Sequence, residues 1–221
     1  MDVLSAIKNR KSTRAFIDKQ VLPQTIDDVL DAARWAPSGA NIQPWRVAVT
    51  TNGTKRNLCL ELADAFQSNS PSNADYTYYA NPVEEPYLGR QRRCGAALYG
   101  ALEISRQDKE QRRAQWLKNY FAFDAPVILF IFIDSSLEKG SWVDMGMFIQ
   151  NILLAARGHG LESCPQASLA EYPDIVRSHL TITDEQLLIC GIALGYSDTP
   201  AAVNQYRTER ESVDSFTSWH S

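Results

Sequence analysis

Five consecutive residues near the N-terminus, Arg10, Lys11, Ser12, Thr13 and Arg14, combine three cations with two hydroxyls. These groups suit a phosphate dianion, because hydrogen bonds from arginine or lysine to phosphate oxygens are roughly twice as strong as neutral ones. The hydroxyls add further donors at short range. A basic pentapeptide can also be a solvated stretch of surface. The segment alone therefore indicates an anion site and leaves plain surface as the alternative.

The net charge of the 221-residue chain is −4, which argues against a nucleic-acid partner, because such partners require a basic surface. Local clusters of arginine stand among Glu and Gln and are typical of a solvated face. The four cysteines and three histidines are scattered and form no zinc motif, so we expect the thiols to be buried. A catalytic triad whose residues are far apart in the sequence and meet only in the folded chain stays open as an alternative.

The length predicts a single domain over residues 1–221. The longest apolar run, residues 127–133, has seven residues, far below the roughly 20 that a membrane helix needs. The N-terminus mixes charged and apolar residues and lacks the apolar core of a secretory signal. We therefore expect a cytoplasmic protein without a membrane partner.

The first half of the chain is predicted to alternate helices and strands. A short amphipathic helix after Asp2 would deliver residues 10–14 just beyond its end. A second helix is expected over residues 25–35, with Thr25 and Asp28 as a capping box. Residues 45–51 are predicted to form a strand, followed by an amphipathic helix.

Residues 68–88 are rich in Ser, Asn, Pro and Tyr, and we expect this irregular excursion to reach about residue 93. Such segments are either functional lids or disordered, and the tyrosines favour a lid. A charged helix is predicted over residues 96–118. Residues 127–133 should follow as a strand buried on both faces, at the centre of the sheet.

A helix over residues 141–157 is apolar almost all round, with Ser141 and Asp144 as a candidate capping box, and must be buried on all sides. Its surroundings are either a single-chain core or a subunit interface. Gly158 and Gly160 do not make a dinucleotide fingerprint, because they end a helix and a third glycine is missing. After an apolar run at residues 187–194, the arm at residues 197–221 is either disordered or wrapped on a neighbour.

Residues 36–45 read Ala-Pro-Ser-Gly-Ala-Asn-Ile-Gln-Pro-Trp, and together with residues 10–14 they carry a family resemblance. The chain resembles the FMN-dependent nitroreductases over nearly its whole length, least well from about residue 69 to residue 120. The resemblance implies an α+β fold with a central mixed or antiparallel sheet flanked by helices. It also implies an intertwined homodimer with an exchanged C-terminal tail and FMN sites at the interface.

The same resemblance assigns site residues. Arg10, Lys11, Ser12 and Arg14 would hold the phosphate, ribityl chain and pyrimidine edge of FMN, and Arg207 or Arg210 would complete the phosphate clamp. Pro37, Ser38, Gly39 and Asn41 would form a wall supplied by the partner subunit. Pro165, Gln166 and Ala167 would present backbone amides to the flavin ring, where an amide stabilises the charge of the reduced ring.

By resemblance, the chain uses NAD(P)H to reduce nitroaromatics, quinones or similar small acceptors in a ping-pong reaction. The excursion would shape the acceptor pocket, and the protein need supply no catalytic acid, base or metal. Enone reduction, dehalogenation and flavin breakdown are alternatives on the same fold. A flavin sensor without turnover, or a partner-binding domain that has lost the cofactor, is an alternative of a different class.

Overall fold

A four-stranded sheet forms the centre of the computed structural model, which describes residues 2–220. The strands are β1 (Trp45–Thr51), β2 (Val127–Asp134), β3 (Glu162–Gln166) and β4 (Gln186–Gly195). They lie in the order β1-β2-β4-β3, and each neighbouring pair is antiparallel. The sheet of the described residues is therefore antiparallel, one of the two arrangements expected.

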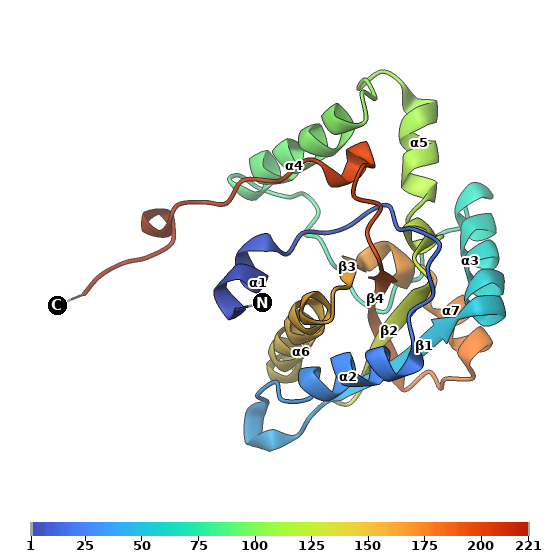
Figure 1. Cartoon of the computed structure of the whole chain (residues 1–221), viewed down its shortest axis with the longest axis vertical. Helices are drawn as coiled ribbons and strands as arrows, with labels where there is room; N and C mark the ends of the chain where they lie inside the picture. Colours follow the sequence, from blue (N-terminus) through green and yellow to red (C-terminus); the bar gives the residue numbers. More distant parts are fainter. Residues whose placement is uncertain (1, 221) are drawn as a thin grey trace.

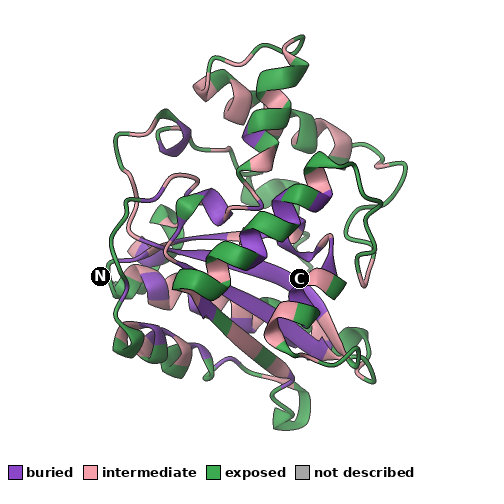
Figure 2. Ribbon diagram, turned by 90° about the vertical axis from the view of Figure 1, so that its right-hand side faces the viewer, coloured by how far each residue is buried: buried purple, intermediate pink, exposed green. Residues whose placement is uncertain are grey.

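Strand β2 is buried on both faces, as its unbroken apolar sequence predicts. Successive side chains of a strand point to opposite faces, so Ile128, Phe130 and Phe132 belong to one core while Leu129, Ile131 and Ile133 belong to the other. Helices α3 (Asn52–Gln67) and α7 (Pro173–Leu180) cover the first face, and α2 (Pro23–Ala33) and α6 (Lys139–Gly158) cover the second (Figure 1). Figure 2 shows the inner strands β2 and β4 as almost continuously buried, whereas the edge strand β1 is largely half-buried or exposed.

Two predicted helix starts are wrong, because other residues begin those helices. Helix α2 begins at Pro23, whose fixed φ suits the first helical position, and Thr25 does not cap it. Helix α6 begins at Lys139 and has no side-chain cap. Asp144 instead accepts a hydrogen bond from the Gly39 amide at 3.1 Å.

The charged helix predicted over residues 96–118 is two helices. Helix α4 (Tyr87–Ala101) starts earlier than expected, and α5 (Lys109–Leu117) starts at an Asp108 cap, which accepts from the Gln111 amide at 2.9 Å. The irregular excursion therefore ends before Tyr87 and not near residue 93. Among the shorter elements, α1 (Val3–Asn9) lies as expected, and 3-10 turns occur at Gly39–Asn41 (η1), Ala122–Asp124 (η2), Ala167–Ala170 (η3), Ala202–Asn204 (η4) and Val213–Ser215 (η5).

The excursion is anchored to strand β4 where that strand bulges. The register of β4 against β2 shifts by one residue, so Ile189 lies between two partnered residues. The Ile189 carbonyl accepts a hydrogen bond from the Tyr76 hydroxyl at 2.8 Å, and the Leu188 amide donates to the Asp75 carboxylate at 2.7 Å. Arg177 holds that carboxylate with two hydrogen bonds of 2.7 and 2.8 Å.

The C-terminal arm first packs against the body and then leaves it. Residues 197–207 contact the N-terminal segment, whereas the following residues run past α4 and then away from the sheet (Figure 1). Phe216 and Trp219 are 71% and 87% exposed. Within residues 2–220, no helix combines the length and apolarity needed to cross a membrane.

Candidate functional site

The basic segment lies along the free edge of β3. Helix α1 ends at Asn9, and the chain then runs parallel to β3, with a bridge between Ser12 and Ser163 and a 3.1 Å hydrogen bond from the Thr13 amide to the Ser163 carbonyl. In an extended chain alternate side chains share a face. Arg10, Ser12 and Arg14 thus face one way, while Thr13 faces inward and is fully buried.

One buried side chain, that of Asn204, joins this segment to the C-terminal arm. Its Oδ1 accepts from the Arg14 amide at 2.8 Å, and its Nδ2 donates to the carbonyls of Ala15 and Asp198 at 2.9 and 2.8 Å. The Lys11 ammonium donates a hydrogen bond to the backbone carbonyl of Asn204. Lys11 therefore holds the arm in place, in addition to any part it takes in ligand binding.

The arm returns its own polar groups to the basic segment. The Arg14 guanidinium donates to the Tyr206 hydroxyl at 3.0 Å, and the Arg207 guanidinium donates to the Arg10 carbonyl at 3.5 Å. Together these residues enclose a cavity of about 120 Å³, which we call the phosphate cavity. It is lined by Arg10, Lys11, Ser12, Arg14, Cys94, Tyr206, Arg207, Thr208 and Arg210.

The phosphate cavity has an excess of positive charge. Its lining residues include five cations, and no carboxylate is among them. Burial lowers the pKa of Arg10, and the positive charges of Arg210 and Arg207 lower it further. The nearby carboxylate of Glu162 already pairs with Arg157. A bound dianion would compensate these charges, and the donor set suits the oxygens of a phosphate.

Predicted wall residues Pro37, Ser38, Gly39 and Asn41 are not among the residues that line this cavity. They form the exposed turn around η1, where the Gly39 amide bonds to Asp144 of α6 and the Ser38 hydroxyl accepts from the Gln43 amide at 3.0 Å. This turn lies beneath α2 and α6 (Figure 1). Within one chain the structure does not bring the two motifs together.

Pro165, Gln166 and Ala167 lie where β3 runs into η3, next to the basic segment. The side chain of Gln166 points into the core, since the residue is 4% exposed and its Nε2 donates to the Asn119 carbonyl at 3.0 Å. Its Oε1 has no partner among the described residues. Only the backbone of Gln166 is therefore placed to face a ligand.

Several residues of the site escaped the sequence analysis. Asn204 carried no signal, because an asparagine in a polar tail has no distinctive spacing. Tyr206 was recognised only as one of the spaced aromatic residues that favour a wrapped arm. Cys94 was expected to be buried like the other thiols, yet it is exposed on α4 and lines the phosphate cavity. That expectation is wrong for Cys94 and confirmed for Cys59, Cys164 and Cys190.

Comparisons with known proteins agree with the geometry. The model of the nitroreductase family matches residues 7–196. A 4-nitrobenzoate reductase from Pseudomonas putida is 36% identical over 216 residues, which are 98% of this chain and 94% of that protein. Two solved structures share the fold over nearly their full lengths, and both are described as FMN-dependent nitroreductases named NfnB.

The first of these structures comes from Sphigopyxis sp. strain HMH and is described as FMN- and NADPH-dependent. It has a TM-score of 0.96 and 34% identity, with all of both chains covered. The second, from Mycobacterium smegmatis in complex with NADPH, has a TM-score of 0.94 and 31% identity. It covers 99% of this chain and 97% of that one.

Proposed function

This chain belongs to the nitroreductase family, and we propose that it is an FMN-dependent oxidoreductase that uses NAD(P)H to reduce nitroaromatics, quinones or similar acceptors. The observation that carries this proposal is the phosphate cavity, where cations from both ends of the chain converge without a carboxylate among them. Similar proteins act on 4-nitrobenzoate or depend on FMN and NADPH, according to their names. These names support nitroaromatics as the acceptor class.

Each part of the site has a distinct task in this reaction. Arg10, Arg207 and Arg210 would bind the phosphate of FMN, and Ser12 would donate a hydrogen bond beside them. When bound, FMN supplies the redox chemistry that joins the nicotinamide donor to the acceptor. The backbone at Gln166 and Ala167 would stabilise negative charge on the ring. The chain's contribution is therefore binding, orientation and electrostatics.

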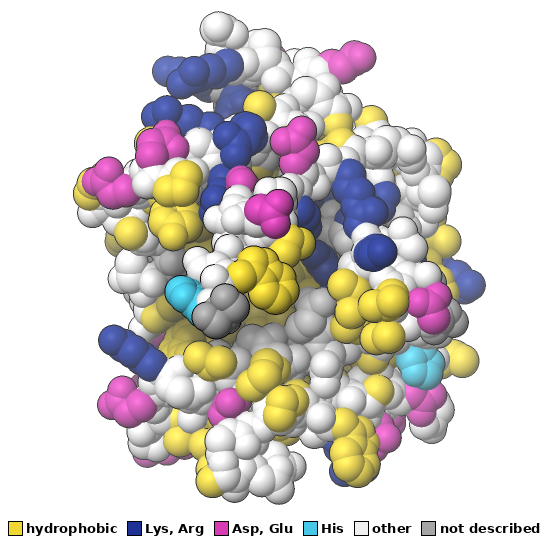
Figure 3. Space-filling model, turned by 90° about the vertical axis from the view of Figure 1, so that its left-hand side faces the viewer, with side chains coloured by type: hydrophobic (Ala, Val, Ile, Leu, Met, Phe, Trp, Pro, Cys, Tyr) yellow, Lys and Arg dark blue, Asp and Glu magenta, His cyan; other side chains and the backbone are white. Residues whose placement is uncertain are grey.

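We further propose that the active form is a homodimer, with Pro37, Ser38, Gly39 and Asn41 completing the site of the partner subunit. One support is the position of this turn, which is exposed and remote from the phosphate cavity of its own chain. Another is the apolar surface on the face that carries α1 and the arm (Figure 3). Val3 and Leu4 of α1 are each 63% exposed, and Val143 of α6 is 66% exposed. A surface of this kind is typical of subunit interfaces.

The remaining parts of the proposal concern the whole chain. We take residues 1–221 as a single domain in the cytoplasm, with residues 68–86 shaping the acceptor pocket. Tyr76 supports that role, because its ring packs against Trp142 of α6 with 4.8 Å between ring centroids, and its neighbours Tyr78 and Tyr79 are both 59% exposed. Exposed aromatic rings on an anchored segment can stack on a flat acceptor.

Purification and anaerobic reduction test the enzyme proposal. We expect a yellow protein that NADH or NADPH bleaches without oxygen, and that a nitroaromatic compound returns to yellow. A yellow protein that neither nicotinamide bleaches would indicate a binding role, and a protein that takes up no added FMN would refute the proposal.

Substitution tests the roles of individual residues in cofactor binding. Arg10→Ala and Arg14→Ala should each weaken FMN retention, since each removes a cation from the phosphate cavity. Arg34→Ala is the control, because Arg34 is an exposed residue at the end of α2 that pairs with Asp31 and does not line the phosphate cavity. Unchanged FMN affinity in both cavity variants would contradict their assigned role.

A further inference from the structure

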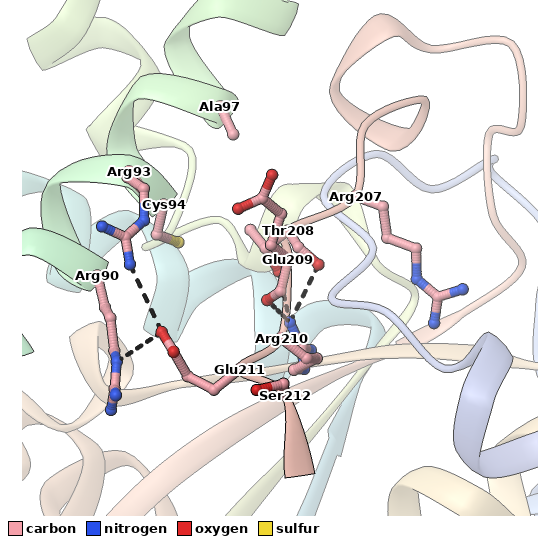
Figure 4. A pocket seen from close by; sticks show the side chains of 10 residues that line it. All are labelled: Arg90, Arg93, Cys94, Ala97, Arg207, Thr208, Glu209, Arg210, Glu211 and Ser212. Atoms are coloured by element: carbon pink, nitrogen blue, oxygen red, sulfur yellow. Dashed lines mark hydrogen bonds and ion pairs between the residues drawn. The ribbon is translucent and has the colours of Figure 1, made fainter. Parts of the chain in front are cut away.

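A second cavity, larger than the phosphate cavity, adjoins it between α4 and the C-terminal arm (Figure 4). The two share Cys94, Arg207, Thr208 and Arg210. The larger cavity has a volume of about 670 Å³, which lies in the range that encloses small-molecule ligands. A phosphate group at the smaller cavity would leave this space free.

Arg90 and Arg93 form the wall of this second cavity on α4. They are three positions apart on a helix and therefore lie on one face. Both reach the same carboxylate oxygen of Glu211 in the arm, from Arg90 Nε at 2.9 Å and from Arg93 Nη2 at 3.5 Å (Figure 4). The chain thus places one of its own anions between two arginines.

The contact between Glu211 and the arginines is of a kind that a ligand can replace. The side chains of Arg90, Arg93 and Glu211 are 40%, 63% and 41% exposed, and ion pairs exposed to this degree are weak. Both pairs use a single oxygen of one monoanion. A phosphate offers more charge and more acceptor oxygens to the two guanidinium groups.

We propose that Arg90 and Arg93 are a second anion subsite, which Glu211 fills in the free protein and which receives the terminal oxyanion of a substrate. This inference rests on the proposed function. The oxyanion has two candidate sources, the 2′-phosphate of NADPH and the carboxylate of an aromatic acceptor such as 4-nitrobenzoate. In either case Glu211 competes with the substrate for the same two arginines.

Pairs of ligands that differ only in the oxyanion separate these sources. Calorimetry on the FMN-loaded protein would compare NADP⁺ with NAD⁺, and steady-state kinetics would compare 4-nitrobenzoate with nitrobenzene. The double variant carries Arg90→Gln and Arg93→Gln. We expect its affinity for NADP⁺, its kcat/KM for 4-nitrobenzoate, or both, to fall about tenfold, because a hydrogen bond to a charged group is lost. The neutral or less charged member should be unaffected.

The direction in which Glu211→Gln changes the affinity for the anionic ligand distinguishes competition from a structural role. If Glu211 competes with the ligand, its removal should strengthen binding of the same anionic member several-fold, opposite to the effect of the arginine substitutions. A purely structural ion pair that fixes the arm would make both changes weaken binding. The control is Arg92→Gln, on the same helix, because Arg92 is exposed and does not line the cavity.

Three results would overturn the inference. In the arginine double variant, they are an equal loss of affinity or kcat/KM for both members of each pair, or no such loss for any ligand. In Glu211→Gln, the third is weaker binding of the anionic member. Selective loss for NADP⁺ assigns the subsite to the donor, and selective loss for 4-nitrobenzoate assigns it to the acceptor. Flavin absorbance and bleaching by NADH should be normal in every variant, so that loss of FMN binding would be recognised separately.

Discussion

Asn204→Ala should detach the C-terminal arm from the basic segment and weaken FMN binding. Asn204 is 1% exposed, and its side chain makes three hydrogen bonds of 2.8–2.9 Å that join residues 14, 15 and 198. Alanine would leave an amide and two carbonyls without these partners. Each net hydrogen bond contributes about 0.5–1.5 kcal/mol, so we expect the free energy of unfolding to fall by about 2–4 kcal/mol.

The effect on the cofactor follows from the same contacts. Arg207 and Arg210 reach the phosphate cavity only because the arm returns beside residues 10–14. With the arm loosened, we expect FMN affinity to fall at least tenfold, or about 1.4 kcal/mol. Titration of apoprotein with FMN, followed by quenching of flavin fluorescence, measures the affinity, and urea denaturation measures the stability.

Gln205→Ala is the matched control for this experiment. Gln205 is the next residue, is exposed, and its side-chain amide donates to the Thr199 carbonyl of the arm itself. Should Asn204→Ala be too unstable to titrate, Asn204→Asp keeps the acceptor for the Arg14 amide and loses only the two donors. A folded Asn204 variant with the FMN affinity of the unaltered protein would refute the reasoning.

Gly191→Ala should lower the free energy of unfolding by about 1–3 kcal/mol, the usual cost of overpacking, because its Cβ would lie 2.5 Å from Leu169 Cδ1 and 2.8 Å from Leu169 Cβ. Gly53→Ala, with no atom within 4 Å, is the control in urea denaturation, and equal effects would contradict the reasoning. Burial raises the pKa of Glu171 above its ordinary value of 4.5, although the Tyr120 hydroxyl opposes the shift. The free energy of unfolding should therefore fall as pH rises from 4.5 through the raised pKa, because the buried carboxyl must then ionise. If the free energy of unfolding of Glu171→Gln and of the unaltered protein depended on pH in the same way, this reasoning would be wrong. Burial raises the pKa of Cys59 to about 11 and that of Cys190 to about 12, and it also raises the pKa of Cys164. The exposed Cys94 should therefore be the one thiol that reacts quickly with Ellman's reagent in the native protein. Cys94→Ser should abolish that fast phase, and a second fast thiol would contradict the assignment.

The sequence predicted best those features that depend on neighbouring residues. Strand β1 has the expected bounds, because alternating apolar residues between Pro44 and Asn52 mark both of its ends. Strand β2 was recognisable because a strand buried on both faces needs an unbroken apolar run. The cations at residues 10–14 were visible for the same local reason.

Features that depend on distant contacts were not predictable. Asn204 acts on residues about 190 positions away, and no local pattern records such a partner. The inward orientation of Gln166 depends on Asn119, which a turn at the end of α5 brings beneath β3. Helix starts at Pro23 and Lys139 replaced the predicted capping boxes, because burial of the helix face outweighs the small stabilisation that a cap gives.

The anchor formed by Asp75 and Tyr76 also bears on aggregation. Strand β3 pairs with Gly191–Gly195, so among residues 2–220 no strand lies beside the earlier part of β4 on that edge. An open edge of this kind can pair with a strand from another molecule. The Asp75 carboxylate and the Tyr76 hydroxyl occupy the Leu188 amide and the Ile189 carbonyl, which are groups that such a strand would use. Residues 68–86 therefore protect the sheet against intermolecular strand addition, whatever their part in binding an acceptor.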